Sequence, residues 1–192
     1  MRIDSFRSFS SQRRSGGFSL VEVLVSILVL AVGLMGAAVM QLNAARTTDQ
    51  SNFHNNAVLL ATQIADEMRA NSTEMRLSSS SFLNFRYPPS TPIGGLSTNC
   101  YTSDCNSSQW AQQAEVEWRA KMNKSLPGGR IEICRDFAVI NSNHDLTWCP
   151  SIPDGADAPV VIKIGWYDKD SSGMPTPNTA PLVALLVSPV TQ

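Results

Sequence analysis

The sequence GGFSLVE occupies residues 16–22 and leads into an apolar run that ends near Met40. No charged residue occurs from Val23 to Met40. As a helix, the segment from Phe18 to Met40 is roughly 35 Å long, which exceeds the ~30 Å hydrocarbon core of a bilayer. The segment is apolar on every side, so it has no stripe that would face a soluble core. The run therefore predicts a helix that is buried in lipid or inside an assembly.

A basic segment precedes this helix. Its charged residues are Arg2, Asp4, Arg7, Arg13 and Arg14. Basic residues beside a spanning helix usually stay in the cytoplasm. We therefore expect a single-pass membrane protein with a cytoplasmic N-terminal segment and a C-terminal part outside the cytoplasm.

Glu22 is hard to reconcile with ordinary targeting signals. A removable secretory signal has an apolar core of about 7–15 residues before its cleavage site. Asn43-Ala44-Ala45 offers such a site, but the run before it is longer. Arg13-Arg14 suggests a twin-arginine signal, although the residues that follow fit it poorly. A plain membrane anchor explains the length but not the carboxylate, which costs roughly 2.5–3.5 kcal/mol at mid-helix.

The sequence GFSLVEVL at residues 17–24 resembles the processing motif of type IV prepilins and type II secretion pseudopilins. The resemblance implies that a prepilin peptidase cuts after Gly17 and methylates the new amino terminus of Phe18. Residues 1–17 would then be a removed cytoplasmic leader, and the apolar helix would be kept. Glu22 would be the glutamate that this family uses in assembly.

Cleavage before Phe18 would give Glu22 a physical role. The new amine could pair with the Glu22 carboxylate of a neighbouring subunit inside a helical bundle. At about 4 Å and an effective dielectric constant near 20, the attraction is about 4 kcal/mol before desolvation is subtracted. We expect such a pair to set the axial register between subunits. The simpler alternative is a glutamate near the membrane interface with no partner.

The chain length favours a single span with one globular domain. We expect the spanning helix at 18–40, an amphipathic continuation at 41–72 and a periplasmic domain at 73–192. Apolar residues recur at helical spacing in the continuation and predict the face that packs on a sheet. They are Ala57, Leu60, Ala61, Ile64, Ala65 and Met68.

Residues 78–99 are rich in serine, proline and glycine and predict a loop, with Phe82, Phe85 and Tyr87 pinning it to the domain or, alternatively, meeting a partner. A second helix is expected from Asn106 to Ser125, because Asn106 and Gln109 have capping-box spacing. Trp110 and Trp118 share a face of this helix, so we expect both in the core.

Three segments predict strands: Arg130–Phe137, Val160–Tyr167 and Leu182–Val187. The continuous apolar run of the third suits a central or covered strand. Three or four antiparallel strands against the long helix make an α+β domain with a type IV pilin-like fold.

Four cysteines allow three disulfide pairings. They are Cys100, Cys105, Cys134 and Cys149. The simplest choice joins Cys100 to Cys105 and Cys134 to Cys149, because each bond closes a local loop. An exported domain lies where disulfides persist. A zinc site is the competing interpretation, but the spacing and the two histidines do not favour it.

Asp168 and Asp170 open a sequence that resembles a calcium-binding loop. The acidic residue that should end the loop would fall near Thr179, so the bidentate ligand is missing. A polar hairpin loop is the simpler interpretation, and we expect no cofactor. The sequence has no motif for a catalytic nucleophile or a phosphate site, so we expect no enzyme. With 15 basic and 16 acidic residues, nothing favours nucleic acid as a partner.

The segment ADEMRAN at residues 65–71, and LPGG at 126–129 after a tryptophan-bearing helix, resemble the minor pilins called type IV pilus modification protein PilV. The resemblance implies a minor pilin that primes pilus assembly and supports twitching motility or adhesion. Its partners would be other minor pilins, the major pilin, the prepilin peptidase and inner-membrane lipid. It would move from the inner membrane to the pilus or cell surface. The alternatives are a type II secretion pseudopilin, a membrane-anchored adhesin or ligand-binding module, and a simple membrane anchor.

Overall fold

The computed structural model describes residues 17–89, 91–96, 98–169, 175–176 and 180–187. Contacts divide the chain into two units, residues 1–46 and 47–192. Helix α1, Leu20–Ala70, begins in the first unit and ends in the second. The chain is α+β, with a long N-terminal helix and a small antiparallel sheet of the kind found in pilins.

The first unit contains the N-terminal part of α1. Its first turn is closed by the Ser19 carbonyl, which accepts hydrogen bonds from the amides of Glu22 and Val23 at 3.0 and 3.2 Å. Every large apolar side chain from Phe18 to Leu42 is 47–83% exposed. This segment therefore has no apolar partner within its own chain in the described residues.

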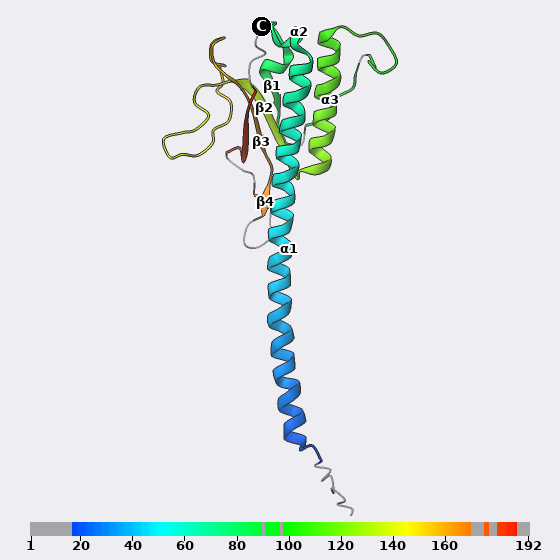
Figure 1. The fold of residues 1–192 in the computed structure, drawn as a ribbon, viewed down its shortest axis with the longest axis vertical. Helices are drawn as coiled ribbons and strands as arrows, with labels where there is room; N and C mark the ends of the chain where they lie inside the picture. Colours follow the sequence, from blue (N-terminus) through cyan, green and yellow to red (C-terminus); the bar gives the residue numbers. More distant parts are fainter. Residues whose placement is uncertain (1–16, 90, 97, 170–174, 177–179, 188–192) are drawn as a thin grey trace, which may run out of the picture. The chain divides into compact units, whose positions relative to one another are not determined.

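The second unit contains the elements of a folded domain, shown in Figure 1. After α1 come α2 (Ser72–Met75), η1 (Ser81–Asn84), β1 (Phe85–Tyr87), α3 (Ser107–Ser125), β2 (Arg130–Arg135), β3 (Val160–Gly165), β4 (Asp168–Lys169), β5 (Pro175–Thr176) and β6 (Val183–Val187). The main sheet is antiparallel in the order β1-β2-β3-β6, and β4 pairs with β5. The C-terminal part of α1 and α3 lie side by side next to the sheet (Figure 1).

The predicted stripe on α1 is confirmed as the helix face that enters the core. All six of its residues, from Ala57 to Met68, are buried. They pack with the inward side chains of β2 and β3, such as Ile133 and Ile162, which face each other across the two strands. Alternate strand residues on one face and helical residues at three- and four-residue spacing thus meet in one apolar cluster.

Helix α3 begins as its sequence predicts. The Asn106 side chain accepts a hydrogen bond from the Gln109 amide at 2.9 Å, and the Gln109 side chain accepts one from the Asn106 amide at 3.0 Å. This capping box fixes the start of the helix. Of the two tryptophans predicted in the core, Trp118 is fully buried, but Trp110 is 42% exposed, so that prediction is wrong for Trp110. Trp110 lies in the first turn of α3, where Tyr101 from the preceding loop covers it edge-on at 5.7 Å.

The sequence LPGG ends α3 with a turn that requires glycine. Gly128 has φ +58°, a conformation that residues with a Cβ rarely adopt. A Cβ there would lie 2.4 Å from the ring of Tyr167. The turn then leads into β2, and the Tyr167 amide bonds to the Pro127 carbonyl at 2.8 Å. The glycine thus lets the helix end pack directly on the chain that leaves β3.

The segment 78–99 is more ordered than the loop that we predicted. It contains η1 and the edge strand β1, which pairs with β2 in the register Phe85 opposite Ile133. Phe82, Phe85 and Tyr87 are all buried, so the interpretation that they attach this segment to the domain is confirmed. The sequence did not predict this strand, because three residues are too few to show an alternation of apolar and polar side chains.

Strand β6 lies at the edge of the described sheet, which corrects our expectation of a central or covered strand. Val183 and Val187 are buried, whereas Leu186 is 58% exposed. Strands β2 and β3 also end at Arg135 and Gly165, two residues earlier than predicted. A continuous apolar run shows that a segment is hydrophobic but not how many neighbours it has.

Candidate functional site

The predicted processing residues lie together at the start of the exposed helix. Gly17 and Phe18 precede α1, and Glu22 is in its first turn. A carboxylate there is favoured by the partial positive charge of the helix N-terminus. No atom lies within 4 Å of a Cβ built on Gly17, so the described chain leaves this site open. Residues 1–16 of the expected leader lie outside the described residues.

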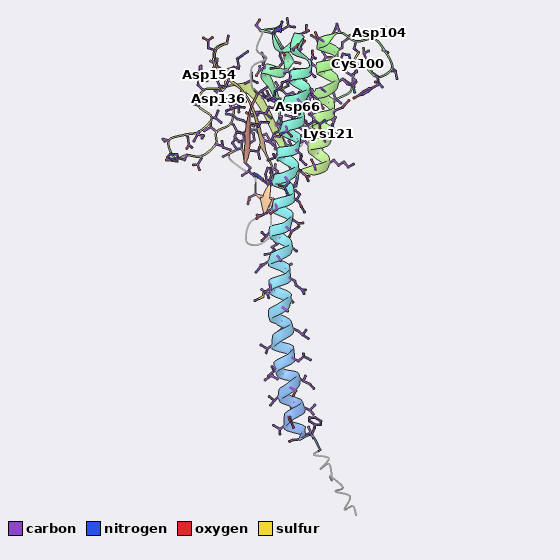
Figure 2. The ribbon with its side chains drawn as sticks, viewed as in Figure 1. Asp66, Cys100, Asp104, Lys121, Asp136 and Asp154 are labelled. Atoms are coloured by element: carbon purple, nitrogen blue, oxygen red, sulfur yellow. A yellow bond between two sulfur atoms is a disulfide. The ribbon has the colours of Figure 1, made fainter. Side chains whose placement is uncertain are left out.

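The helix that follows meets the length and composition of a membrane span. Leu20–Ala70 is the one candidate in the described chain, with a mean hydropathy of 2.7 in its most apolar part. Figure 2 shows side chains on all sides of the N-terminal part of this helix. Burying a large apolar side chain gains about 1.5–3 kcal/mol. A membrane anchor or a helix bundle therefore provides what the free chain in water lacks.

The structure contains both local disulfides. Cys100 joins Cys105, five residues on, and Cys134 joins Cys149 across fifteen residues. The first ties a loop directly before α3, and the second fastens the long β2–β3 connection to β2. These bonds suit an oxidising compartment.

The proposed calcium ligands fall largely outside the described residues. Asp168 belongs to β4, but its side chain is not among the described atoms, and Asp170 lies outside the described ranges. His54 is an exposed residue of α1 and His144 lies in the β2–β3 connection with φ 66°.

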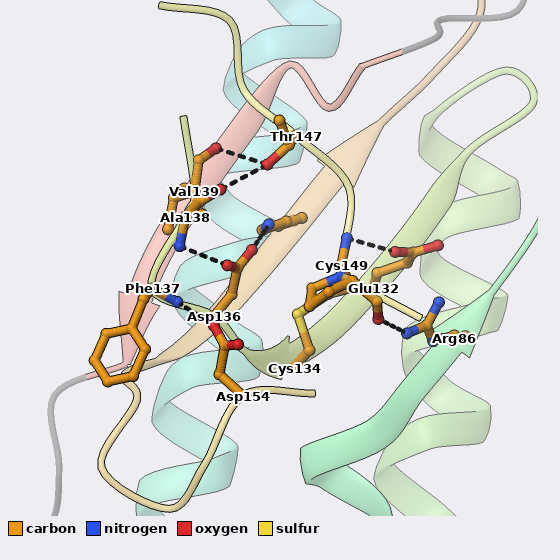
Figure 3. A network of polar contacts seen from close by, with 12 residues as sticks. Arg86, Glu132, Cys134, Asp136, Phe137, Ala138, Val139, Thr147, Cys149 and Asp154 are labelled. Carbon is orange, nitrogen blue, oxygen red and sulfur yellow. Dashed lines mark hydrogen bonds and ion pairs between the residues drawn. A yellow bond between two sulfur atoms is a disulfide. The ribbon is translucent and has the colours of Figure 1, made fainter. Parts of the chain in front are cut away.

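A buried polar cluster on the sheet was not predicted from the sequence. The Lys163 amine donates to Oδ2 of Asp136, while Oδ1 of Asp136 accepts from the Ala138 amide at 2.7 Å. Nearby, Glu132 is buried, and its Oε2 accepts from the Cys149 amide at 2.9 Å. Figure 3 shows these groups around the Cys134–Cys149 bond. The one signal in the sequence was a lysine at the centre of an apolar strand.

Two groups of α3 and its preceding loop have shifted pKa values. Burial raises the pKa of Glu115 above its ordinary value of 4.5, and the neighbouring Arg119 opposes this shift. The hydrogen bond from the Tyr101 hydroxyl to Glu117 raises the pKa of Tyr101, because it stabilises the protonated phenol. Each shift makes the charged form of its group less favourable than in an exposed group of the same kind.

One of three comparisons with known proteins gives a match, and that match lies in the N-terminal segment. Searches of curated proteins and of solved structures find no match to this chain. Residues 12–38 match the family model of the prokaryotic N-terminal methylation motif. That motif is typical of type IV pilins and prepilin-like proteins, and it covers Gly17, Phe18 and Glu22.

Proposed function

We propose that this protein is a minor pilin of a bacterial type IV pilus, similar to the PilV family, and that its role is structural. The observation that carries the proposal is the methylation motif at residues 12–38, which includes the start of α1, where every large apolar side chain from Phe18 to Leu42 is exposed. The same helix ends inside a disulfide-bonded α+β domain. One chain thus joins a segment suited to a filament core with a domain suited to the filament surface.

The processing step follows from the motif. A prepilin peptidase would cut after Gly17 on the cytoplasmic side and methylate Phe18. The domain would stay in the periplasm until the subunit enters a complex with other minor pilins and the major pilin. Glu22 would then pair with the amine of a neighbouring subunit, since an unpaired carboxylate among apolar helices is costly.

The absence of proline from Phe18 to Met40 favours a minor subunit, because many major pilins have a proline in this helix. A type II secretion pseudopilin is the second candidate, because the same motif serves both systems. Deletion of the gene separates the two: loss of surface pili supports the first, and loss of protein secretion with normal pili supports the second.

The primary experiment is intact mass and N-terminal sequencing of the protein extracted from membranes of its own host. We expect a chain that begins at Phe18 with one methyl group on its amine. Gly17→Ala should leave the leader attached, whereas Gly16→Ala should be processed normally. A terminus at Met1 in the native protein would mean a simple anchor, and one near Arg46 would mean a removable signal; either result would reject the pilin proposal.

A further inference from the structure

A pocket of about 500 Å³ lies between the C-terminal end of α1 and the first half of α3. Its lining residues come from α1, η1, the disulfide-bonded loop and α3. They are Glu67, Ala70, Asn71, Phe82, Tyr101, Trp110, Gln113, Ala114 and Glu117. The volume is in the range of pockets that hold small ligands or single side chains. All of these residues belong to the second unit of the chain.

Two aromatic rings at a right angle to each other line the pocket. Tyr101 and Trp110 have centroids 5.7 Å apart and an interplanar angle of 87°. Tyr101 lies inside the loop closed by the Cys100–Cys105 disulfide, so this bond restrains its position. The Tyr101 hydroxyl donates to Glu117 at 2.8 Å, which further fixes the ring. Both rings are exposed, although large aromatic side chains normally seek burial.

The polar groups of the pocket leave acceptors for a ligand. The Gln113 amide nitrogen donates to Glu117 at 2.9 Å, and the Trp118 indole donates to Glu67. The donors named here therefore point at carboxylates of the protein itself. The Gln113 Oε1 atom is buried and has no hydrogen-bond partner among the described residues, and the whole residue is only 7% exposed. An orphan buried acceptor is costly and points to a missing donor.

The charge of the pocket is negative. Glu67 and Glu117 contribute two carboxylates, and none of the lining residues, all of them in the described chain, is lysine or arginine. Aromatic faces attract cations, and carboxylates attract donors that carry positive charge. A planar guanidinium matches this set better than a spherical ammonium, since it can stack on a ring while its in-plane donors reach separate acceptors.

We propose that this pocket binds a guanidinium group, held by the Glu117 carboxylate and the Gln113 amide oxygen and stacked on the Trp110 ring. The source is either a small free guanidine compound or an arginine side chain of a partner protein. This inference does not depend on the pilus role, because it rests on the folded domain alone.

The test is isothermal titration calorimetry on the full chain in a non-ionic detergent. The probe is N-acetyl-arginine amide, which has a single guanidinium. Two matched compounds are N-acetyl-citrulline amide, which is neutral, and N-acetyl-lysine amide, which carries an ammonium group. We expect binding of the arginine probe that weakens at high salt, at least tenfold weaker binding of the lysine probe, and none of the citrulline probe. Equal binding of the citrulline or lysine probe would overturn the proposal, as would the absence of arginine binding.

Variants test the geometry. Glu117→Gln should weaken binding about tenfold or more, because it removes the charge-assisted bond. Trp110→Ala should weaken it about 2- to 5-fold, as expected for one exposed cation–π contact. The control is Asp104→Asn, which removes an exposed charge from the same disulfide loop outside the pocket lining and should change the affinity less than twofold (Figure 2). Unchanged affinity in both pocket variants would reject the assignment. If Glu117→Gln fails to fold, the affinity of Trp110→Ala alone decides the test.

Two further probes distinguish the source. Propylguanidinium supplies the side chain alone, and a capped Gly-Gly-Arg-Gly-Gly peptide supplies the same group on a polypeptide. Binding of the two within about threefold assigns a free guanidine compound as a sufficient ligand. A tenfold preference for the peptide assigns an arginine on a partner chain.

Discussion

Lys163 of β3 donates a hydrogen bond from its amine to Oδ2 of Asp136, which directly follows β2, and both side chains are almost completely removed from water. A charge of either sign is costly in such a place unless its partner is present. Asp136 is the first residue of the β2–β3 connection, so the pair ties the start of this connection to β3, an inner strand of the sheet.

Removing one member of the buried pair should destabilise the domain far more than removing both members. We expect Lys163→Met or Asp136→Leu alone to lower the free energy of unfolding by about 3–5 kcal/mol, because each leaves a buried charge unpaired. The double variant should recover most of this loss. Urea unfolding of the detergent-solubilised chain, followed by tryptophan fluorescence, measures all three.

The exposed pair of Asp66 and Arg69 on α1 provides the control. Arg69→Met should change stability by less than about 1 kcal/mol, since water screens an exposed pair. If the double Lys163/Asp136 variant were as unstable as the worse single variant, the pair would act through shape rather than charge.

Glu115 should make the domain less stable as the pH rises. Burial raises its pKa, so the folded state holds the proton more tightly than the unfolded state. The stability that comes from the protonated form is complete below about pH 4.5 and is lost as the pH rises through the folded pKa. Glu115→Gln has no such loss. The unfolding free energy of the variant minus that of the wild type should therefore increase from pH 4 upwards and then level off.

This difference is read from urea unfolding at several pH values on both proteins, so that groups common to the two cancel. Glu117→Gln is the matched control, because Glu117 lies two residues away on α3 and is more exposed. A difference between Glu115→Gln and wild type that is constant with pH would contradict the assigned effect of burial.

Gly128→Ala should destabilise the domain by roughly 2 kcal/mol or more. The left-handed backbone at φ +58° costs a residue with a Cβ about 1–2 kcal/mol, and the new methyl group would collide with the Tyr167 ring. Gly155→Ala is the control, because a Cβ there meets no atom within 4 Å and should change stability by less than about 0.5 kcal/mol. Thermal unfolding monitored by near-ultraviolet circular dichroism compares the two variants. Equal melting temperatures would show that the turn can relax.

Glu22→Gln should leave membrane insertion and leader removal intact but reduce incorporation into pili. The change keeps the size of the side chain and removes the charge that we propose pairs with the neighbouring amine. The measurement is an immunoblot of sheared pili against the membrane fraction. We expect at least a severalfold loss from the pili, whereas Asp49→Asn, an exposed acid later in α1, should assemble normally. Normal incorporation of the Glu22 variant would refute the register role.

The residues that are contiguous or periodic were predictable from the sequence. The processing motif consists of residues that are adjacent in the sequence. The length of the apolar run that follows is also given directly by the sequence. The buried face of α1 from Ala57 to Met68 follows from helical spacing, and the capping box of α3 follows from Asn106 and Gln109. These features depend on interactions within about one turn of helix, so local sequence encodes them.

The predictions that were wrong concern features that depend on neighbours from distant parts of the chain. Trp110 shares a helix face with Trp118, but only Trp118 has η1 and β1 packed against it, through Phe82 and Phe85. Strand β6 is as apolar as a central strand, yet its place in the chain order leaves it at the edge. Spacing along one element specifies which residues share a face, and only the packing of other elements specifies how far that face is covered.

The sequence by itself determined the membrane-capable helix, its methylation motif and the α+β class, because each is encoded by local order, length and periodicity. Tertiary structure alone decided that Lys163 meets Asp136 and that Tyr101, Trp110, Gln113 and Glu117 surround one pocket. Lys163 and Asp136 are 27 residues apart in the sequence, and Tyr101 lies in the loop before α3, the helix that contains the other three pocket residues. Their meeting depends on chain closure and side-chain packing, which no periodicity in the sequence records.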